Sequence, residues 1–206
     1  MKSLSEAEEF WNDRYSNQEF VYGKQPNAFF KAQLDQLEPG ILLLPAEGEG
    51  RNGVYAARNG WQADAFDMSE NGRKKALALA DQYNVSINYQ ISDCQNVQIK
   101  SEQYDVIALI YAHIDESMRR KIHRKLIHGL KPGGTLILEA FSKKQLENDS
   151  GGPRDQAMLY SLEDLKIDFK ALNMTTGMQR DRQISEGNHH QGIANIIRIV
   201  AQKPIN

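Results

Sequence analysis

The stretch PAEGEGRNG (45–53) decides the fold of this 206-residue chain. It follows the apolar run ILLL (41–44) and precedes a segment with helical spacing. Its glycines, at positions 48, 50 and 53, have the GxGxxG spacing of a strand-to-helix turn whose backbone N–H groups hold a pyrophosphate. The same turn carries two glutamates, Glu47 and Glu49, which an anion-binding turn is not expected to contain.

Length and composition limit the possibilities. A chain of 206 residues is expected to form one domain with a substantial core. The 25 Lys and Arg residues balance 27 Asp and Glu residues without a long basic run, which gives no support to nucleic-acid binding. No apolar run approaches the ~18–20 residues needed to span a bilayer, and no signal peptide is recognisable. The single cysteine, Cys94, excludes an internal disulfide, so we expect a cytoplasmic protein.

Apolar runs alternate with helical segments along the first two thirds of the chain. We expect strands at 41–44, 63–66, 85–91, 104–110 and 135–141. Ser69 and Ser117 are predicted N-caps of the helices that follow two of these strands, and KPGG (131–134) is predicted to end the second helix. This alternation is typical of βαβ units and a parallel sheet.

The pattern changes after Ser161, which begins the capping signature SLED. The segments DFKALNM (168–174), RQIS (182–185) and IANIIRIVAQ (193–202) indicate strands joined by connections that contain glycine. The sheet is therefore expected to end in an antiparallel hairpin.

An acidic residue with a characteristic spacing follows the glycine turn. Asp67 ends the second predicted strand and lies 19 residues after Gly48 (67 − 48), close to the ~20 expected of an acid that binds a ribose hydroxyl. A tight turn and a helix cap are the structural alternatives for the two features taken singly. Together, in the order strand, turn, helix, strand, they indicate a ligand that contains adenosine.

The glutamates select among such ligands. At an effective dielectric constant of ~20, a carboxylate ~5 Å from a phosphate charge is repelled by about 3 kcal/mol. S-adenosylmethionine has no phosphate but carries a sulfonium and an ammonium, which a carboxylate attracts. We expect Glu47 to accept hydrogen bonds from the ammonium or to support the loop. Side chains that point to solvent are the alternative for both glutamates, Glu49 in particular.

The quoted residues resemble the class I S-adenosylmethionine-dependent methyltransferases, and within them the tellurite-resistance-type small-molecule methyltransferases. The general family pattern is carried by ILLLPAEGEGRN, AFDMS, SDCQN, YDVIALIYAHI and LKPGGTLILEAF. The subgroup resemblance extends to FWNDRYSNQEFVYGKQPNAFF near the start and to FSKKQL, GGP and ML later. The resemblance implies an α/β Rossmann-like fold with a mostly parallel, seven-stranded sheet, flanking helices and an antiparallel C-terminal hairpin.

The resemblance also implies roles for individual residues. Those expected to bind the cofactor are Glu47, Gly48 and Gly50 in the loop, Asp67 at the ribose, Met68, Asp93 and Cys94 at the adenine, and Tyr111 and Ala112 at the methionine end. A small buried apolar residue is the alternative for Cys94. The sequence departs from many class I enzymes at Leu44 and Ala46, where these have an acid and the first glycine of the motif. The acidic role is therefore transferred to Glu47.

The predictions for the residues that bind the methyl acceptor depend more on the resemblance than on any motif. Methyl transfer to a soft nucleophile, of the thiol or chalcogen-oxyanion type, needs positioning and exclusion of water but no obligatory base. His113 and Arg14 are the expected catalytic residues, and Tyr22 and Arg154 the expected substrate-binding residues. The alternatives are bracing of the sheet for Arg14, packing for Tyr22 and solvation for Arg154.

No metal site is expected. The pair His189-His190 resembles a set of ligands, but adjacent residues on a strand point to opposite faces and cannot share a metal ion.

We therefore expect a single domain, 1–206, with an N-terminal lid (1–35), a cofactor-binding core (40–142) and a C-terminal part that completes the sheet (143–206). Its expected partner is a small-molecule acceptor, without nucleic acid or membrane, and a homodimer is left open. An NAD(P)-dependent oxidoreductase of Rossmann type is the alternative favoured by the complete glycine spacing. A non-catalytic cofactor-binding protein is a second alternative.

Overall fold

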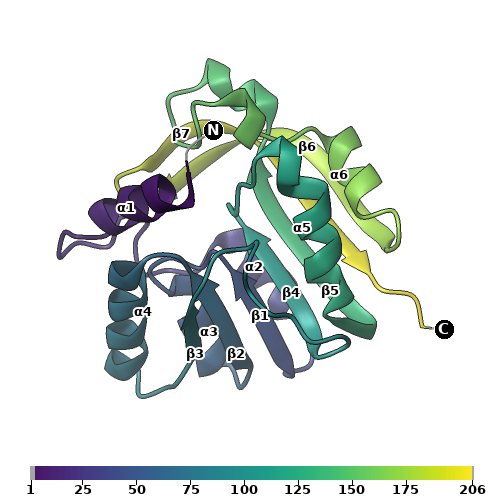
Figure 1. Ribbon diagram of the computed structural model, residues 1–206, viewed down its shortest axis with the longest axis horizontal. Helices are drawn as coiled ribbons and strands as arrows, with labels where there is room; N and C mark the ends of the chain where they lie inside the picture. Colours follow the sequence, from purple (N-terminus) through teal and green to yellow (C-terminus); the bar gives the residue numbers. More distant parts are fainter. Residues whose placement is uncertain (1–2, 206) are drawn as a thin grey trace.

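A computed structural model describes residues 3–205 and contains one seven-stranded sheet in the order β3-β2-β1-β4-β5-β7-β6 (Figure 1). The strands are β1 (Ile41–Pro45), β2 (Gln62–Asp67), β3 (Asn88–Ile91), β4 (Tyr104–Ile110), β5 (Leu130–Phe141), β6 (Asn173–Glu186) and β7 (His190–Gln202). The first five are parallel, whereas β7 runs antiparallel between β5 and β6. The strand order reverses between β1 and β4, and in open sheets the ligand lies at the carboxyl edge of such a point.

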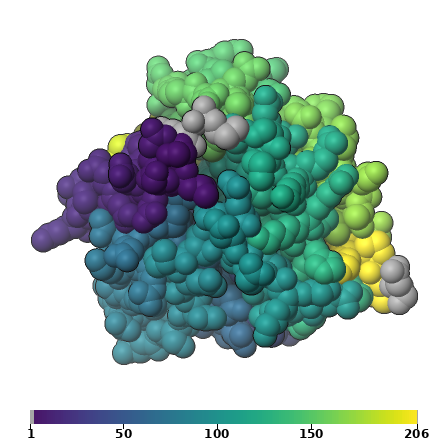
Figure 2. All heavy atoms as spheres, viewed as in Figure 1, coloured from purple at the N-terminus to yellow at the C-terminus, as the bar shows by residue number. Residues whose placement is uncertain are grey.

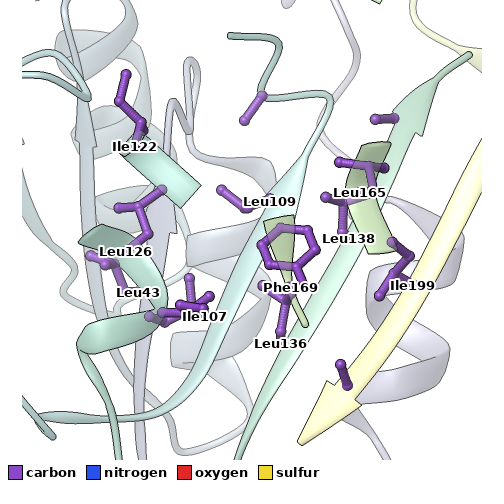
Figure 3. Close-up of a cluster of buried hydrophobic side chains, with 14 of the residues drawn as sticks. Leu43, Ile107, Leu109, Ile122, Leu126, Leu136, Leu138, Leu165, Phe169 and Ile199 are labelled. Atoms are coloured by element: carbon purple, nitrogen blue, oxygen red, sulfur yellow. The ribbon is translucent and has the colours of Figure 1, made fainter. Parts of the chain in front are cut away.

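Helices cover both faces of the sheet because the side chains of each strand alternate between them. Leu42 and Leu44 of β1 pack in the cluster that includes α2 (Ala28–Leu34), α3 (Arg51–Arg58) and α4 (Glu70–Gln82). Leu43 joins the opposite cluster, which includes α5 (Glu116–His128) and α6 (Leu162–Asp168). Figure 3 shows this second cluster, in which Leu126 of α5 and Phe169 after α6 pack on the strands. Because β1 is buried on both faces, its sequence is a continuous apolar run and does not alternate between apolar and polar residues.

The helix boundaries agree with the sequence at two of the three predicted caps. Ser69 Oγ accepts a hydrogen bond from the amide of Gly72, and Ser161 Oγ accepts one from the amide of Asp164. The prediction for Ser117 was wrong, because α5 begins two residues earlier with Asp115 as its N-cap. The Asp115 carboxylate accepts both the amide and the hydroxyl of Ser117, and an aspartate is at least as good a cap as a serine.

Two further boundaries differ from the prediction. Helix α5 ends at His128 with Gly129 as its C-cap, so KPGG (131–134) lies within β5, beside a register shift against β4, and does not end the helix. In the C-terminal region, the start of DFKALNM belongs to α6 and to a turn, and its end joins RQIS (182–185) in the single long strand β6. The antiparallel hairpin itself is confirmed.

The N-terminal segment packs across the carboxyl edge of the sheet. Helix α1 (Leu4–Arg14) contacts α4. The side-chain oxygen of Asn12 accepts a hydrogen bond from the Ser69 hydroxyl, and the backbone carbonyl of Asn12 accepts one from the Asn71 side chain. In Figure 2 the purple atoms of this segment lie against the blue atoms of the α4 region. None of the helices between residues 3 and 205 has the length and apolar character to cross a bilayer.

Candidate functional site

The first glutamate of the glycine turn supports the loop. Glu47 Oε1 accepts hydrogen bonds from the amides of Asn52 (2.9 Å) and Gly53 (2.7 Å), in the first turn of α3. The side chain is buried, and burial raises the pKa of Glu47 to about 7 although these donors oppose the shift. Of the two roles expected for Glu47, the structure contains the supporting one.

The second glutamate ties the N-terminal segment to the turn. Glu49 Oε2 accepts a hydrogen bond from the amide of Val21 (2.8 Å), and its Oε1 forms an ion pair with Lys75 Nζ (2.5 Å). The Lys75 ammonium also donates to the carbonyls of Asn17 and Glu19. Glu49 is only 4% exposed, so it does not point to solvent.

The glycines of the turn have different reasons to be there. Gly50 has φ +85°, and a Cβ there would lie 2.5 Å from the Cβ of Ala76, so this glycine allows α4 to pack closely. Gly48 has φ +61°, and a Cβ there would lie 2.6 Å from the hydroxyl oxygen of Tyr15. The Gly48 backbone therefore faces the N-terminal segment.

Asp67 joins the turn to the end of β2. Its Oδ2 accepts the amide of Gly48 (3.1 Å) and its Oδ1 accepts the amide of Ser69 (2.9 Å). Burial raises the pKa of Asp67 to about 6, against the effect of these backbone donors. Tyr89 Oη donates to the carbonyl of Gly48 (2.6 Å) and fixes the turn from β3. The acid and the glycine turn thus meet at the carboxyl edge, where the ribose was expected.

The residues expected near the adenine follow β2 and β3. Met68 is half-buried beside Asp67. The Asp93 carboxylate accepts the amides of Gln95 and Asn96, so it stabilises its own turn. Cys94 is half-buried and packs against the core, and burial raises the pKa of its thiol to about 12.

Tyr111 lies where β4 ends, with φ +53°. Its hydroxyl donates to Glu139 Oε1 (3.0 Å), and its ring stacks on Phe141 with centroids 4.6 Å apart. The next residue, Ala112, is buried, and its carbonyl accepts a hydrogen bond from Tyr160 Oη (2.9 Å). These contacts hold the loop after β4 at the carboxyl edge.

His113 uses both of its ring nitrogens within the protein. Nδ1 lies 2.7 Å from the carbonyl of Met158, and Nε2 accepts the amide of Phe141 (3.2 Å), which requires the Nδ1–H tautomer. Burial lowers the pKa of His113 to about 4. The sequence analysis expected a catalytic role for His113. This geometry instead favours a neutral residue that holds the loop in position.

The remaining acceptor-side candidates separate into two places. Arg14 Nη1 lies 3.4 Å from Nδ1 of His189, and the ring of Tyr22 lies 4.5 Å from that of His190. Both therefore meet the β6–β7 hairpin. Arg154 hydrogen-bonds the carbonyl of Asn148 and pairs with Asp149 in its own loop, with its side chain 57% exposed, which agrees with the solvated alternative.

Sequence reasoning did not identify the charged residues behind this site. Arg51 Nη2 pairs with Glu186 Oε2 (2.7 Å). Glu139, with no exposed surface, accepts hydrogen bonds from Asn27 Nδ2 (2.7 Å) and Arg198 Nε (2.5 Å). One signal was available, since Glu139 interrupts the apolar run TLILEAF. A charged residue within a buried strand needs partners, and these come from remote segments.

Two surface hollows lie away from this edge. One is at the amino ends of β2 and β3, beside Trp61 and Asn88, and the other lies beside α5 and α6, near Arg124 and Asp168. Neither is lined by the residues described above. Within residues 3–205, no group of three or more His, Cys, Asp or Glu side chains could hold a metal ion.

Comparison with known proteins bears on these observations. Residues 44–134 match the family described as "Methyltransferase domain". No curated protein matches the sequence.

Several solved structures share the fold. One, described as "Conversion of a Disulfide Bond into a Thioacetal Group during Echinomycin Biosynthesis", has a TM-score of 0.75 at 13% identity over 97% of this chain and 93% of that chain. TehB from Haemophilus influenzae has a TM-score of 0.69 at 17% identity over 95% of this chain and 66% of its own. An S-adenosylmethionine-dependent methyltransferase from Clostridium acetobutylicum ATCC 824 has a TM-score of 0.68 at 14% identity over 98% of this chain and 100% of its own.

The matched segment contains the glycine turn, Asp67 and the loop after β4. The expected fold class is confirmed, with its mostly parallel sheet and antiparallel last pair. An enzyme with S-adenosylmethionine as its cofactor is confirmed as well. The NAD(P)-dependent and non-catalytic alternatives find no support in these matches.

Proposed function

We propose that this chain, whose residues 44–134 form a methyltransferase domain that uses S-adenosylmethionine, transfers the methyl group to a small, soft nucleophile of the thiol or chalcogen-oxyanion type. We place it in the tellurite-resistance-type subgroup. The similarity to TehB supports that placement, as do the N-terminal and C-terminal sequence motifs.

The acidic carboxyl edge carries the cofactor part of this proposal. Glu47, Glu49 and Asp67 are each at most 8% exposed and gather around one turn. The one arginine in the turn, Arg51, is engaged by Glu186 and by the carbonyl of Tyr22. Such a set of carboxylate acceptors fits a cofactor with an ammonium and a sulfonium and opposes a pyrophosphate.

Within this edge we assign the roles expected from the sequence. Asp67 binds the ribose hydroxyls, the Gly48 backbone lies along the methionine portion, and Met68, Asp93 and Cys94 border the adenine. Tyr111 and Ala112 lie at the methyl end. The hydrogen bond between Asp67 and the amide of Gly48 supports these assignments, because it brings the two binding elements together.

The acceptor part depends on the aromatic residues beyond the methyl end. The rings of Tyr22, Tyr111 and Phe141 lie close to His190, and the N-terminal segment covers them as a lid. An aromatic, covered site favours a small and polarisable acceptor. A solved structure of similar fold, whose description concerns conversion of a disulfide into a thioacetal, adds support for a sulfur nucleophile.

The reaction follows from these positions. When bound, S-adenosylmethionine supplies an electrophilic methyl group on its sulfonium. The lone pair of the acceptor would form the new bond to the methyl carbon as the carbon–sulfur bond breaks with its electron pair on the sulfur, and a thiol acceptor would in addition release its proton. The chain contributes orientation through the turn and Asp67, and exclusion of water through the N-terminal segment with Arg14 at the acceptor end.

The test uses the full-length protein with S-adenosylmethionine and a panel of thiols, selenite and tellurite. We expect S-adenosylhomocysteine to accumulate with at least one acceptor, as measured by liquid chromatography. Calorimetry is expected to detect binding of S-adenosylmethionine and S-adenosylhomocysteine, but not of NAD or NADP. Tight NAD binding without any response to S-adenosylmethionine would refute the proposal. A cytoplasmic location and a homodimer stay predictions from the sequence.

A further inference from the structure

His190 lies at the centre of the acceptor side. It opens β7 and pairs in register with Glu186, across the turn of the β6–β7 hairpin. Its ring lies 4.5 Å from that of Tyr22, 4.7 Å from that of Tyr111 and 5.2 Å from that of Phe141. The residue is only 5% exposed. Three aromatic rings from three separate segments therefore enclose one imidazole.

The imidazole of His190 has a polar atom without a hydrogen-bond partner. Its Nδ1 is buried and unbonded, and the nearest carboxylate oxygen, Oε2 of Glu186, lies 3.8 Å away, beyond hydrogen-bonding distance. Both ring nitrogens of His113, by contrast, are occupied. A buried nitrogen without a partner is costly and rare in a folded protein, so it requires an explanation.

Glu186 is held in place as a carboxylate beside this ring. Its Oε2 accepts Arg51 Nη2 (2.7 Å) and its Oε1 accepts Asn27 Nδ2 (3.0 Å). Burial would raise the pKa of Glu186, yet its polar neighbours, the Arg51 guanidinium among them, lower it to about 2. A small movement would let Nδ1–H donate to this carboxylate and leave the Nε2 lone pair free to accept a proton.

The groups that face His190 determine its charge. They are Glu186 from β6, Arg51 from α3, Tyr22 from the N-terminal segment, Tyr111 and His113 from the loop after β4, and the adjacent His189. Burial lowers the pKa of His190, Glu186 opposes that shift, and Arg51 reinforces it. The imidazole is therefore neutral at neutral pH, as a proton acceptor must be.

The neighbouring charges are neutralised within the protein. Arg51 pairs with Glu186, and Glu139 pairs with Arg198. The enclosure around His190 thus offers aromatic surface and one neutral base, and the arginine that faces His190, Arg51, is already paired with a carboxylate. This combination fits an acceptor that arrives neutral and protonated.

We propose that His190 is the general base of the reaction, oriented by Glu186, and that the physiological acceptor is a neutral small thiol. This inference rests on the proposed function. In the step, the S–H bond of the acceptor breaks and its proton passes to Nε2 of His190. The sulfur electron pair forms the bond to the methyl carbon, and the carbon–sulfonium bond breaks. The products are a thioether, S-adenosylhomocysteine and an imidazolium that returns its proton to water.

The experiment compares His190→Gln with the matched control His128→Gln, a change at an exposed histidine at the end of α5. Each protein is assayed with an aliphatic thiol, which is protonated at neutral pH, and with an aromatic thiol that is already ionised. For His190→Gln we expect kcat/KM with the aliphatic thiol to fall about 10²–10⁴-fold. With the aromatic thiolate it should fall less than about threefold, because no proton has to be removed.

Equal losses with both thiols, or no loss with the aliphatic thiol, would overturn the role of His190. The affinity for S-adenosylhomocysteine, measured by calorimetry, should stay unchanged in the variant. The wild-type pH profile provides a measurement that needs no variant: an acidic limb should occur with the aliphatic thiol, whereas any acidic limb with the aromatic thiol should follow the ionisation of that thiol itself. Wild-type protein that binds the cofactor but methylates neither thiol would instead refute the proposed function.

Discussion

The proposed cofactor side and the proposed acceptor side of the carboxyl edge are built in different ways. The cofactor side consists of one turn and one strand end, and its two elements lie 19 residues apart (67 − 48) and meet through the hydrogen bond from Gly48 to Asp67. The acceptor side combines Tyr22, Tyr111, Phe141 and His190, which come from four separate segments. A local site leaves its spacing in the sequence, whereas a composite site is visible only once the chain has folded.

The largest expected effect tests whether the two sides depend on the same segment. Deletion of residues 1–22 removes Arg14 and Tyr22, and it also removes the Val21 amide that donates a hydrogen bond to Glu49. We expect turnover of any small acceptor to fall more than ~100-fold, because water and substrate are no longer controlled. Affinity for S-adenosylhomocysteine should remain appreciable in calorimetry, since Asp67 and the glycine turn remain. Full activity in the truncated protein would eliminate the lid.

The next effect concerns the cofactor side alone. Asp67→Ala removes charge-assisted hydrogen bonds worth ~1.5–3 kcal/mol, so we expect about a ten- to hundredfold loss of cofactor affinity by calorimetry. Asp67→Asn is the matched control for stability, because its amide oxygen can still accept one of the amides of Gly48 and Ser69. Wild-type affinity in a folded Asp67→Ala protein would show that Asp67 does not bind the ribose.

A smaller effect should appear in the dependence of stability on pH. The pKa of Glu47 is raised from 4.5 to about 7, so the folded state binds more protons than the unfolded state between these values. The free energy of unfolding should therefore fall as the pH rises from about 4.5 to about 7, by an amount on the order of 2 kcal/mol.

Glu47→Gln should flatten this slope. The amide oxygen can still accept the amides of Asn52 and Gly53, but the side chain does not titrate. Urea denaturation at several pH values measures the change, and Glu38→Gln, a change at an exposed glutamate, is the control. An unchanged slope in Glu47→Gln would assign the pH dependence to other groups, with Asp67 the first to test because its pKa is also raised.

The smallest effect concerns a residue that the sequence placed on the acceptor side. Arg154 pairs with Asp149 at the surface, and exposed ion pairs contribute ~0–1 kcal/mol. We expect Arg154→Ala to change kcat/KM less than about twofold in the thiol assay. A loss of tenfold or more in kcat/KM would show that Arg154 contributes to acceptor binding.

The sequence predicted the parts of the molecule that have a local cause. The run ILLL, the glycine turn and the caps at Ser69 and Ser161 follow from residues that are neighbours in the chain. The N-cap of α5 was misplaced because Asp115 and Ser117 are both good caps, and sequence alone does not choose between them. The two predicted strands within 168–185 proved to be one because pairing along β7 continues through Gly177.

The acceptor side could be predicted only in part. Tyr22 and Arg14 were placed there by resemblance, but the ion pair between Arg51 and Glu186 joins residues 135 positions apart. His190 was considered only as half of a metal pair with His189, which lies in the turn before β7. The surroundings of His190, a buried and unpartnered Nδ1 among three aromatic rings, depend on which segments fold against it.

Glu49 has a thermodynamic consequence for the order of binding. Its carboxylate joins the amide of Val21 to the turn, while Tyr15 closes on Gly48, so the lid and the proposed cofactor site share one set of contacts. Binding free energies that share a conformational equilibrium are reciprocal. If closure of the lid strengthens cofactor binding by a given free energy, the bound cofactor stabilises the closed lid by the same free energy. For an acceptor that binds only beneath the closed lid, the factor by which the acceptor raises the affinity for the cofactor therefore equals the factor by which the cofactor raises the affinity for the acceptor.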